Sequence, residues 1–418
     1  MLTSLRISHR RALPGGRSFR LLLASLAVSS CGDWLYNVAL LAAVYARTGS
    51  ATWVALTTAA RVLPVVVVGP LGGVMADRYD RRALMIASDL TRAGLMGALA
   101  AVIALGLPIV LAPVLAAMAT AAATVQPPSV AASTARLVSD GELQRANALR
   151  ALIGQAAIVT GPVLGAFLLL ATGPAVAILA NGLTFIASAA AILAIGVGPA
   201  FVPSRQARAT SMRVLDEIRA GAQALRAAPT AIRLIAADVL CSIVIGLLTV
   251  ALVLVSRRVG AGAGGYGILL GGFGAGGILG AIIVGRLDAT SRWRLLLAIG
   301  LVLVAVVLIA LSAVDSIAAA LALAVIGGGG MIIGEVLTDT ALPRMVNDEI
   351  LARAYGLAFP ASIAGMAVGS LIAGPLIALL GLHGALIATG LFLLGAATLL
   401  LRRPFIPAES DASHSAAI

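Results

Sequence analysis

The chain consists of long apolar runs separated by short polar turns from one end to the other. A run of about 20 apolar residues is long enough to cross a bilayer as an α-helix. The pattern therefore predicts an all-α polytopic membrane protein with twelve transmembrane helices. The runs, with ends defined to within about four residues, are 19–46, 52–76, 83–106, 109–133, 146–171, 175–197, 231–256, 264–286, 293–312, 316–340, 354–380 and 383–402.

The longest polar stretch between runs divides the twelve into two sets of six. Within it, apolar residues recur at helical spacing from Val214 to Leu225, which predicts a short amphipathic helix on the cytoplasmic membrane surface. A plain linker is the favoured interpretation of this helix, and a regulatory role is the alternative. The predicted organisation is a cytoplasmic tail at 1–18, a six-helix bundle at 19–197, the linker at 198–230, a second six-helix bundle at 231–403 and a polar tail at 404–418.

The composition agrees with a membrane protein and argues against other classes. Hydrophobic residues make up 61% of the chain and charged residues 11%, with a mean hydropathy of +1.07, whereas soluble domains carry about 25% charged residues. The net charge of +12 does not indicate nucleic-acid binding, because the arginines are dispersed between apolar runs. The three histidines and two cysteines are scattered, so we expect no cofactor, no metal site and no enzymatic activity.

The basic residues predict the orientation, since positive charge is retained on the cytoplasmic side. All 29 of them are arginines. With both termini inside, 24 arginines fall on the cytoplasmic side or within four residues of it, three fall outside and two, Arg61 and Arg92, fall deep within runs. This distribution predicts a multi-pass protein with both termini in the cytoplasm.

The chain also repeats itself at an offset of 208 residues, half its length. Four residues of 69–78 recur in 277–286, and seven residues of 136–149 recur in 344–357 at the same offset. Two parallel six-helix halves are the repeat expected of one large class of secondary transporters.

Two motifs resemble signatures of the major facilitator superfamily. Residues 69–82, GPLGGVMADRYDRR, resemble the superfamily pattern G-x-L-a-D-r-x-G-r-R after the second helix, although the late glycine is absent. Gly161, Pro162 and Gly165 begin GPVLGA, which resembles the antiporter motif G-P-x-x-G-G except at Ala166. The absence of the late glycine in the first motif is common in the bacterial drug and siderophore exporter branch, which this chain resembles, whereas Ala166 weakens the second match. This resemblance implies a bacterial plasma-membrane protein that works by alternating access, with proton-coupled efflux and multidrug resistance as the expected activity.

The resemblance also implies a conformational latch at the cytoplasmic end of the second helix. Small residues let helices approach closely, so Gly69, Gly72 and Gly73 are predicted to pack this helix end. Asp77 would face the N-terminus of a neighbouring helix, the eleventh. The basic residues would form ion pairs with acids across the bundle. For Arg81 and Arg82 the alternative is that they are solvated and serve only to set the orientation in the membrane. The basic residues of this predicted latch are Arg78, Arg81 and Arg82.

Ionisable residues within the runs are candidates for proton coupling, because charge at membrane depth is costly. Asp33 and Arg61 lie near mid-depth in adjacent runs and are predicted to pair beside a central cavity. A structural ion pair is the alternative. Asp89 and Arg92 are three residues apart, which favours an intrahelical pair. Asp238 and Glu335 are further proton-coupling or cavity candidates, with gate contacts as the alternative.

The leading hypothesis is export of small amphipathic or hydrophobic compounds through a cavity that is apolar apart from these acids. The expected partners are a small-molecule substrate, protons and the lipid bilayer, and we expect a monomer. A proton-coupled importer of a metabolite and a lipid-translocating protein are the alternative functions.

Overall fold

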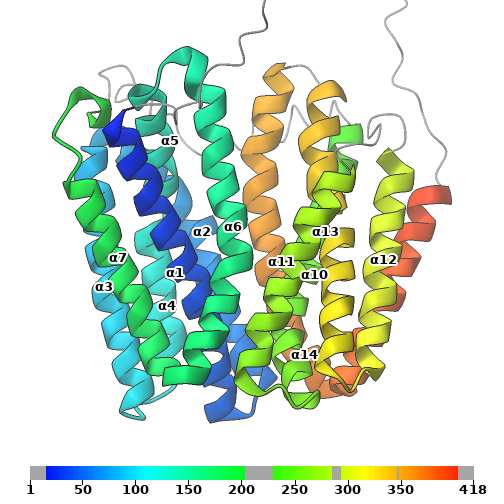
Figure 1. The fold of residues 1–418 in the computed structure, drawn as a ribbon. Coiled ribbons are helices and arrows are strands. Elements are labelled where there is room, and N and C mark those ends of the chain that lie inside the picture. The colour runs from blue at the N-terminus through cyan, green and yellow to red at the C-terminus, as the bar shows by residue number, and fades with distance from the viewer. Residues whose placement is uncertain (1–15, 203–228, 285–292, 346–347, 403–418) are drawn as a thin grey trace, which may run out of the picture.

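The computed structural model describes residues 16–202, 229–284, 293–345 and 348–402. The amphipathic helix expected between Val214 and Leu225 and most of both tails lie outside these ranges. Within them the chain is helical and contains no β-strand, and the helices stand side by side in one bundle (Figure 1). The elements are α1 (Arg17–Thr48), α2 (Ala51–Arg78), α3 (Arg81–Ala104), α4 (Leu111–Ala123), α5 (Gln126–Leu137), α6 (Asp140–Thr172), α7 (Pro174–Leu193), the 3₁₀ turn η1 (Pro199–Phe201), α10 (Pro229–Arg258), α11 (Gly262–Val284), α12 (Trp293–Ala313), α13 (Ile317–Met345) and α14 (Asp348–Arg402).

The predicted twelve crossings are present. Eleven segments of the described chain are long and apolar enough to span a membrane, and α4 and α5 together form one of them, Leu111–Leu137. The last segment, Ala358–Leu401, has 44 residues, enough for two crossings. It is broken at Gly381, where φ is 68° and ψ is 171°. Glycine adopts a positive φ at little steric cost, so this residue makes the turn between the eleventh and twelfth spans.

The same helix contacts occur in both halves of the chain. We call α1–α7 the N-terminal half and α10–α14 the C-terminal half. α1 packs against α6 and α7, and α10 packs against α14. α2 packs against α4 as α11 packs against α13, and α3 packs against α7 as α12 packs against α14. The 208-residue repeat therefore corresponds to two six-helix bundles with one packing scheme.

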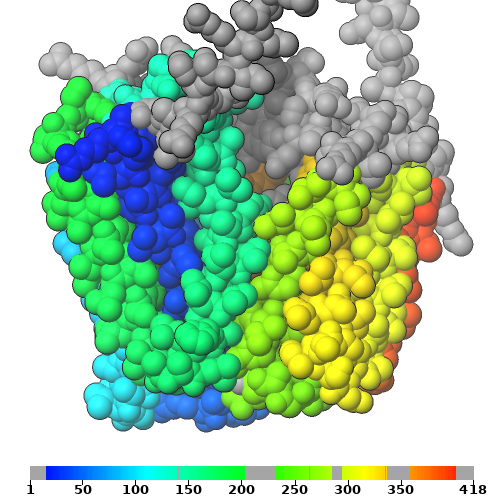
Figure 2. Space-filling model, viewed as in Figure 1, coloured from blue at the N-terminus to red at the C-terminus, as the bar shows by residue number. Residues whose placement is uncertain are grey.

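The two halves meet chiefly through α6 with α11 and α2 with α14. We call the end of the bundle at which α1 begins the proximal face and the opposite end the distal face, at the top and bottom of Figure 1. A side chain at Gly274, midway along α11, would contact Ile158, and one at Gly374 would contact Thr52 near the distal face. Figure 2 shows the two halves in surface contact across the lower part of the view. These contacts thus join the halves between mid-bundle and the distal face.

Four arginines bind the free carbonyl groups at helix C-termini, where a cation is favoured by the helix dipole. At the distal face, Arg47 donates to carbonyl groups at the end of α3, and Arg258 donates to those at the end of α12. At the proximal face, Arg82 donates to carbonyl groups at the end of α7, and Arg294 donates to one at the end of α14. Two of the arginines predicted outside the cytoplasm therefore have a local structural role. The accepting carbonyls are those of Val102, Gly106 and Leu107 for Arg47, Leu311, Ser312 and Val314 for Arg258, Ile192 and Leu193 for Arg82, and Leu400 for Arg294.

Candidate functional site

One arginine joins two carboxylates inside the N-terminal half. Arg92 of α3 donates through Nη2 to both carboxylate oxygens of Asp33 on α1, at 2.7 and 2.5 Å. Its Nη1 lies 3.7 Å from Oδ1 of Asp89, one turn earlier on α3. The guanidinium also stacks on the ring of Phe185 from α7, 3.8 Å from the centroid. We call Asp33, Arg92 and Asp89 the ion cluster.

Polar side chains from two further helices complete the surroundings of Asp89. Its side chain is fully buried. It accepts hydrogen bonds from the hydroxyl of Ser188 on α7 at 2.6 Å and from Nε2 of Gln126 on α5 at 2.7 Å. A buried charge requires such partners, because its desolvation is otherwise costly. The ion cluster therefore ties together α1, α3, α5 and α7.

Two members of the ion cluster, Asp33 and Arg92, line a cavity of about 570 Å³. The carboxylate of Asp33 is 36% exposed there, whereas the side chain of Arg92 is 8% exposed. Asp33 lies about 24 Å along α1 from the proximal end, at 1.5 Å per residue, so the cavity occupies the proximal half of the bundle. Its lining is more polar than the sequence predicted. The polar residues that line it besides the ion cluster are Ser25, Ser29, Ser30, Gln126, Asn147, Arg150 and Ser188.

The predicted pair between Asp33 and Arg61 is wrong. Arg61 instead donates from Nε to the hydroxyl of Tyr36 at 2.8 Å and from Nη1 to Oδ1 of Asn37. Its guanidinium also lies 4.7 Å from the centroid of the Tyr36 ring. Tyr36 and Asn37 lie one turn after Asp33 on the same side of α1. Arg61 and Arg92 therefore bind successive turns of this helix. The interpretation of Asp89 and Arg92 as an intrahelical pair is incomplete, because Arg92 binds Asp33 more closely than Asp89.

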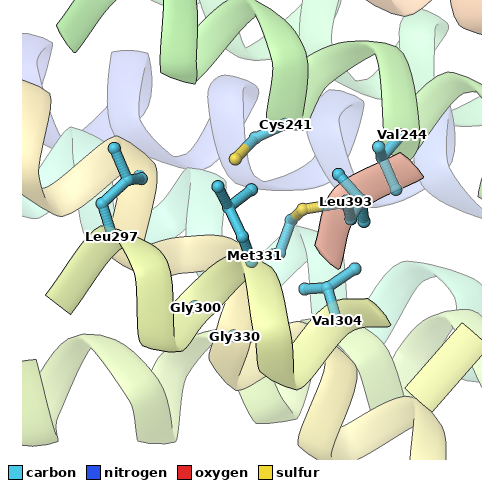
Figure 3. A pocket seen from close by; sticks show the side chains of 10 residues that line it. Cys241, Val244, Leu297, Gly300, Val304, Gly330, Met331 and Leu393 are labelled. Atoms are coloured by element: carbon cyan, nitrogen blue, oxygen red, sulfur yellow. The ribbon is translucent and has the colours of Figure 1, made fainter. Parts of the chain in front are cut away.

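The C-terminal half carries an apolar counterpart of the ion cluster. At the repeat offset of 208 residues, each polar position of the cluster and its surroundings corresponds to a small or apolar residue. These residues line a narrow space that has no room for a water molecule (Figure 3). The two halves therefore share a packing scheme, but the space in the C-terminal half that corresponds to the ion cluster is lined by apolar and small residues. The correspondences are Asp33 with Cys241, Asp89 with Leu297, Arg92 with Gly300, Gln126 with Gly334 and Phe185 with Leu393.

The remaining acidic candidates lie in the C-terminal half. Asp238 on α10 accepts a hydrogen bond from the hydroxyl of Ser362 on α14. It is not among the described residues that line the cavity. Glu335 lies in α13, and its side chain is outside the described part of the structure. Within the described residues, no group of His, Cys, Asp or Glu side chains is arranged to hold a metal ion.

Only one of the three glycines at the end of α2 has the predicted packing role. A side chain at Gly72 would collide with the backbone of Thr124 at the junction of α4 and α5. A Cβ added at Gly69 or Gly73 would have no neighbour within 4 Å, so the prediction that these two pack closely is wrong for this conformation. At the repeat offset, Gly280 packs as Gly72 does, since a Cβ there would lie 2.7 Å from the carbonyl oxygen of Gly329.

The charged residues after these glycines include three that interact within the N-terminal half, Asp77, Arg81 and Arg82. Asp77 lies 3.7 Å from Arg81, and its side chain is 52% exposed. Arg81 also donates from Nε to the carbonyl of Ala76 at 3.0 Å. Arg82 caps α7 rather than joining acids across the bundle. Arg78 is engaged as well.

The GPVLGA motif forms the contact between α6 and two other helices. Side chains at Gly161 and Gly165 would collide with α1, the second at 2.6 Å from the carbonyl oxygen of Leu35. On the other side of α6, a side chain at Gly267 of α11 would lie 2.5 Å from the carbonyl oxygen of Pro162. The motif therefore links the helix that carries Asp33 to the opposite half.

Sequence reasoning missed several members of the site. Gln126, Phe185 and Ser188 were not identified as site residues, and Arg150 was counted only for topology. A signal existed for Arg92, because it is one of two arginines inside the predicted spans. No comparable signal marks the other three, since single polar or aromatic residues are common in membrane helices.

Comparisons with known proteins agree with this architecture. A family model described as "Transmembrane secretion effector" (MFS_3) matches residues 15–417. The uncharacterized MFS-type transporter YfiS of Bacillus subtilis (strain 168) is 42% identical over 73 residues, a stretch that covers 17% of this chain and 18% of YfiS. The match thus spans less than a fifth of that relative.

Solved structures of transporters share the fold. A mutant of the nucleoside transporter NupG has a TM-score of 0.72 at 11% identity, with 92% of this chain and 98% of that chain covered. A bacterial homologue of the human lysosomal transporter Spinster has a TM-score of 0.71 at 14% identity, with 94% and 97% covered. A transporter of the POT family has a TM-score of 0.66 at 11% identity, with 94% and 96% covered.

Proposed function

The chain belongs to the MFS_3 family of major facilitator transporters, and on this premise we propose that it couples the export of small amphipathic compounds to proton entry. It is a membrane transporter rather than an enzyme, and the direction, coupling ion and compound class are the content of the proposal. We place the proximal face in the bacterial cytoplasm, since the arginine-rich turns lie there. The protein would work as a monomer with both termini inside.

The observation that carries proton coupling is the charge imbalance of the ion cluster beside the cavity. Two carboxylates share one guanidinium, so the cluster has room for one proton without leaving Arg92 unpaired. Asp33 is the member exposed to the cavity, and Asp89 is sealed behind it. Asp33 would therefore take up and release the proton, while Asp89 holds Arg92 in place.

Protonation of Asp33 would change the conformation of the rest of the molecule through α1. Protonation of Asp33 would weaken its bond to Arg92, the direct ionic link between α1 and α3. α1 packs tightly on α6 at Gly165, and α6 carries the contact of Pro162 with α11. A small movement of α1 would thus be passed to the interface between the halves, which alternating access must open and close.

Asp77, the acid at the end of α2, would act in the conformation in which the proximal face is closed. In this structure Asp77 is half-exposed and paired with Arg81 of its own half. We propose that it meets the N-terminus of α14 when the proximal face closes, with Arg78 beside it. The equivalent position in the C-terminal half is Gly285, so this latch would be one-sided.

Export is tested with the purified protein in liposomes that carry a defined pH gradient. Asp33→Asn keeps a hydrogen-bonding side chain but cannot exchange a proton. We expect this variant to bind substrate and exchange it down its own gradient while losing accumulation driven by the pH gradient. Asp315→Asn, a change at an exposed residue of a distal turn, serves as the matched control.

Two results would contradict the proposal. One is pH-driven accumulation by Asp33→Asn at the wild-type rate. The other is transport by the wild type that is unaffected when a protonophore collapses the gradient. Accumulation of a nutrient in cells that overproduce the protein would instead favour the importer, and a change in the leaflet distribution of a labelled lipid would favour lipid translocation.

A further inference from the structure

We propose that the cavity selects compounds that carry an anionic group, and that Arg150 of α6 binds this group. The inference rests on the proposed transport function and adds the charge class of the compound. It concerns recognition and leaves proton coupling with Asp33.

Arg150 is a cation on the cavity wall without a counter-ion among the described residues. Its Nη1 donates to Oδ1 of Asn147, one turn earlier on α6, at 3.2 Å. Its Nε is buried and has no hydrogen-bond partner in the described structure. A guanidinium has five donors, and most of those of Arg150 have no protein partner within the described chain.

The other arginine of the cavity is in the opposite situation. The charge of Arg92 is balanced by Asp33 through two short hydrogen bonds, and Asp89 lies next to it. The ion cluster therefore presents no excess positive charge to a ligand. Arg150 is the lining residue whose positive charge is left uncompensated within the described chain.

An uncompensated guanidinium in a membrane-embedded cavity favours an anion. Its charge is incompletely solvated, and an anion restores the lost interactions. Carboxylate and phosphate groups match the planar donors of arginine and form two parallel hydrogen bonds with them. Asn147 beside it supplies an amide donor to the same group.

The rest of the cavity suits an apolar body. Leu26, Pro127, Val130 and Ala151 contribute apolar surface to the same cavity wall as Arg150. The volume of about 570 Å³ is within the range of about 300–1,000 Å³ typical of drug-sized ligand sites. The inferred ligand is therefore a compact amphiphile with a carboxylate or phosphate at one end.

The test uses three probes that share one apolar body and differ in charge. These are 1-naphthoate, 1-naphthalenemethanol and 1-naphthylmethylammonium, and their binding to the full-length protein in neutral detergent is measured by calorimetry. We expect the wild type to bind the anion about tenfold more tightly than the cation, since charged hydrogen bonds contribute about 1.5–3 kcal/mol.

Variants separate recognition from a general disturbance of the fold. Arg150→Gln should weaken binding of the anion about tenfold and leave binding of the alcohol within about twofold. Arg150→Lys should recover part of the loss, because it keeps the charge but not the planar donors. Arg20→Gln removes one exposed positive charge near the same face and should change neither affinity.

The inference is overturned if the wild type binds none of the probes, or if it binds the cation as tightly as the anion. Equal weakening of all three probes in Arg150→Gln would likewise assign the residue a structural role. The proposed export function is judged independently, because Arg150→Gln should still accumulate a neutral compound when a pH gradient is imposed. Loss of that accumulation in the wild type would refute export while leaving the binding result interpretable.

Discussion

At the scale of single residues, the decisive feature is one guanidinium between two carboxylates. Arg92 neutralises only part of the charge of Asp33 and Asp89, and its stacking on Phe185 holds it between them. Removing one carboxylate leaves a balanced pair. Removing the arginine leaves two acids facing each other without a cation, one of them fully buried. The three residues are therefore unequal in their contribution to stability.

This inequality gives a prediction for unfolding. Arg92→Gln should lower the free energy of unfolding by about 3–5 kcal/mol, the cost of breaking a buried pair from one side. Asp33→Asn should lower the free energy of unfolding markedly less, because Arg92 remains paired with Asp89. Denaturant unfolding of the purified protein in detergent measures both. The double variant Arg92→Gln, Asp89→Asn should regain part of the stability, and an Arg92→Gln protein as stable as wild type would refute the role of the cluster.

At the scale of helices, glycines act where two backbones come together and not wherever they occur. Gly72 lies against the backbone of Thr124, whereas Gly73 has open space beside it. Gly161 and Gly165 set the separation of α6 and α1, and Gly267 lets α11 approach Pro162. Adjacent glycines in one motif can therefore differ completely in the substitutions that they tolerate.

Neighbouring glycines at the end of α2 provide a matched test. Gly72→Val should destabilise the protein by about 1–3 kcal/mol through overpacking, because the Thr124 backbone cannot move aside easily. Gly73→Ala should instead be neutral or raise stability by about 0.5–1 kcal/mol, since alanine is the better helix former. Thermal unfolding in detergent compares them. Equal tolerance of both changes would show that α2 and α4 do not approach as closely as described.

At the scale of the whole molecule, the two halves meet between mid-bundle and the distal face, and the cavity lies on the proximal side. α2 and α14 provide one of the two main contacts, at Ala55 and Gly374. The ion cluster belongs to the N-terminal half, and the space that corresponds to it in the C-terminal half is apolar. A transport cycle must separate the halves at the distal contact to release a compound on that side.

A disulfide across this contact should stop the cycle. A Cβ at position 374 would lie 3.3 Å from that of Ala55, close to the separation of about 3.5–4.5 Å in disulfides. Ala55→Cys with Gly374→Cys should lose transport on oxidation and regain it on reduction, while the oxidised protein still binds substrate. Each single cysteine variant is the control. Full transport by a completely cross-linked protein would show that the distal contact does not open.

The sequence alone determined the spans, their number, the two-fold repeat and the class of fold. These are local properties, since the transfer of a segment of about 20 residues into lipid depends on that segment. Even the turn at Gly381 was placed correctly, between the predicted spans 354–380 and 383–402. The repeat was visible because corresponding residues keep one spacing at two separate places in the chain.

Only the tertiary structure decided which of these residues meet. Asp33 binds Arg92 instead of Arg61, Arg82 caps α7, and Arg150 faces a cavity, although all of them were visible as charges in the sequence. Hydropathy places a residue at a depth but does not specify the rotation of its helix. That rotation is set by close packing between segments far apart in the chain, such as Gly165 on Leu35. Depth also needs finer resolution than hydropathy gives, because Asp33 and the partners of Arg61, Tyr36 and Asn37, are only one turn apart on α1.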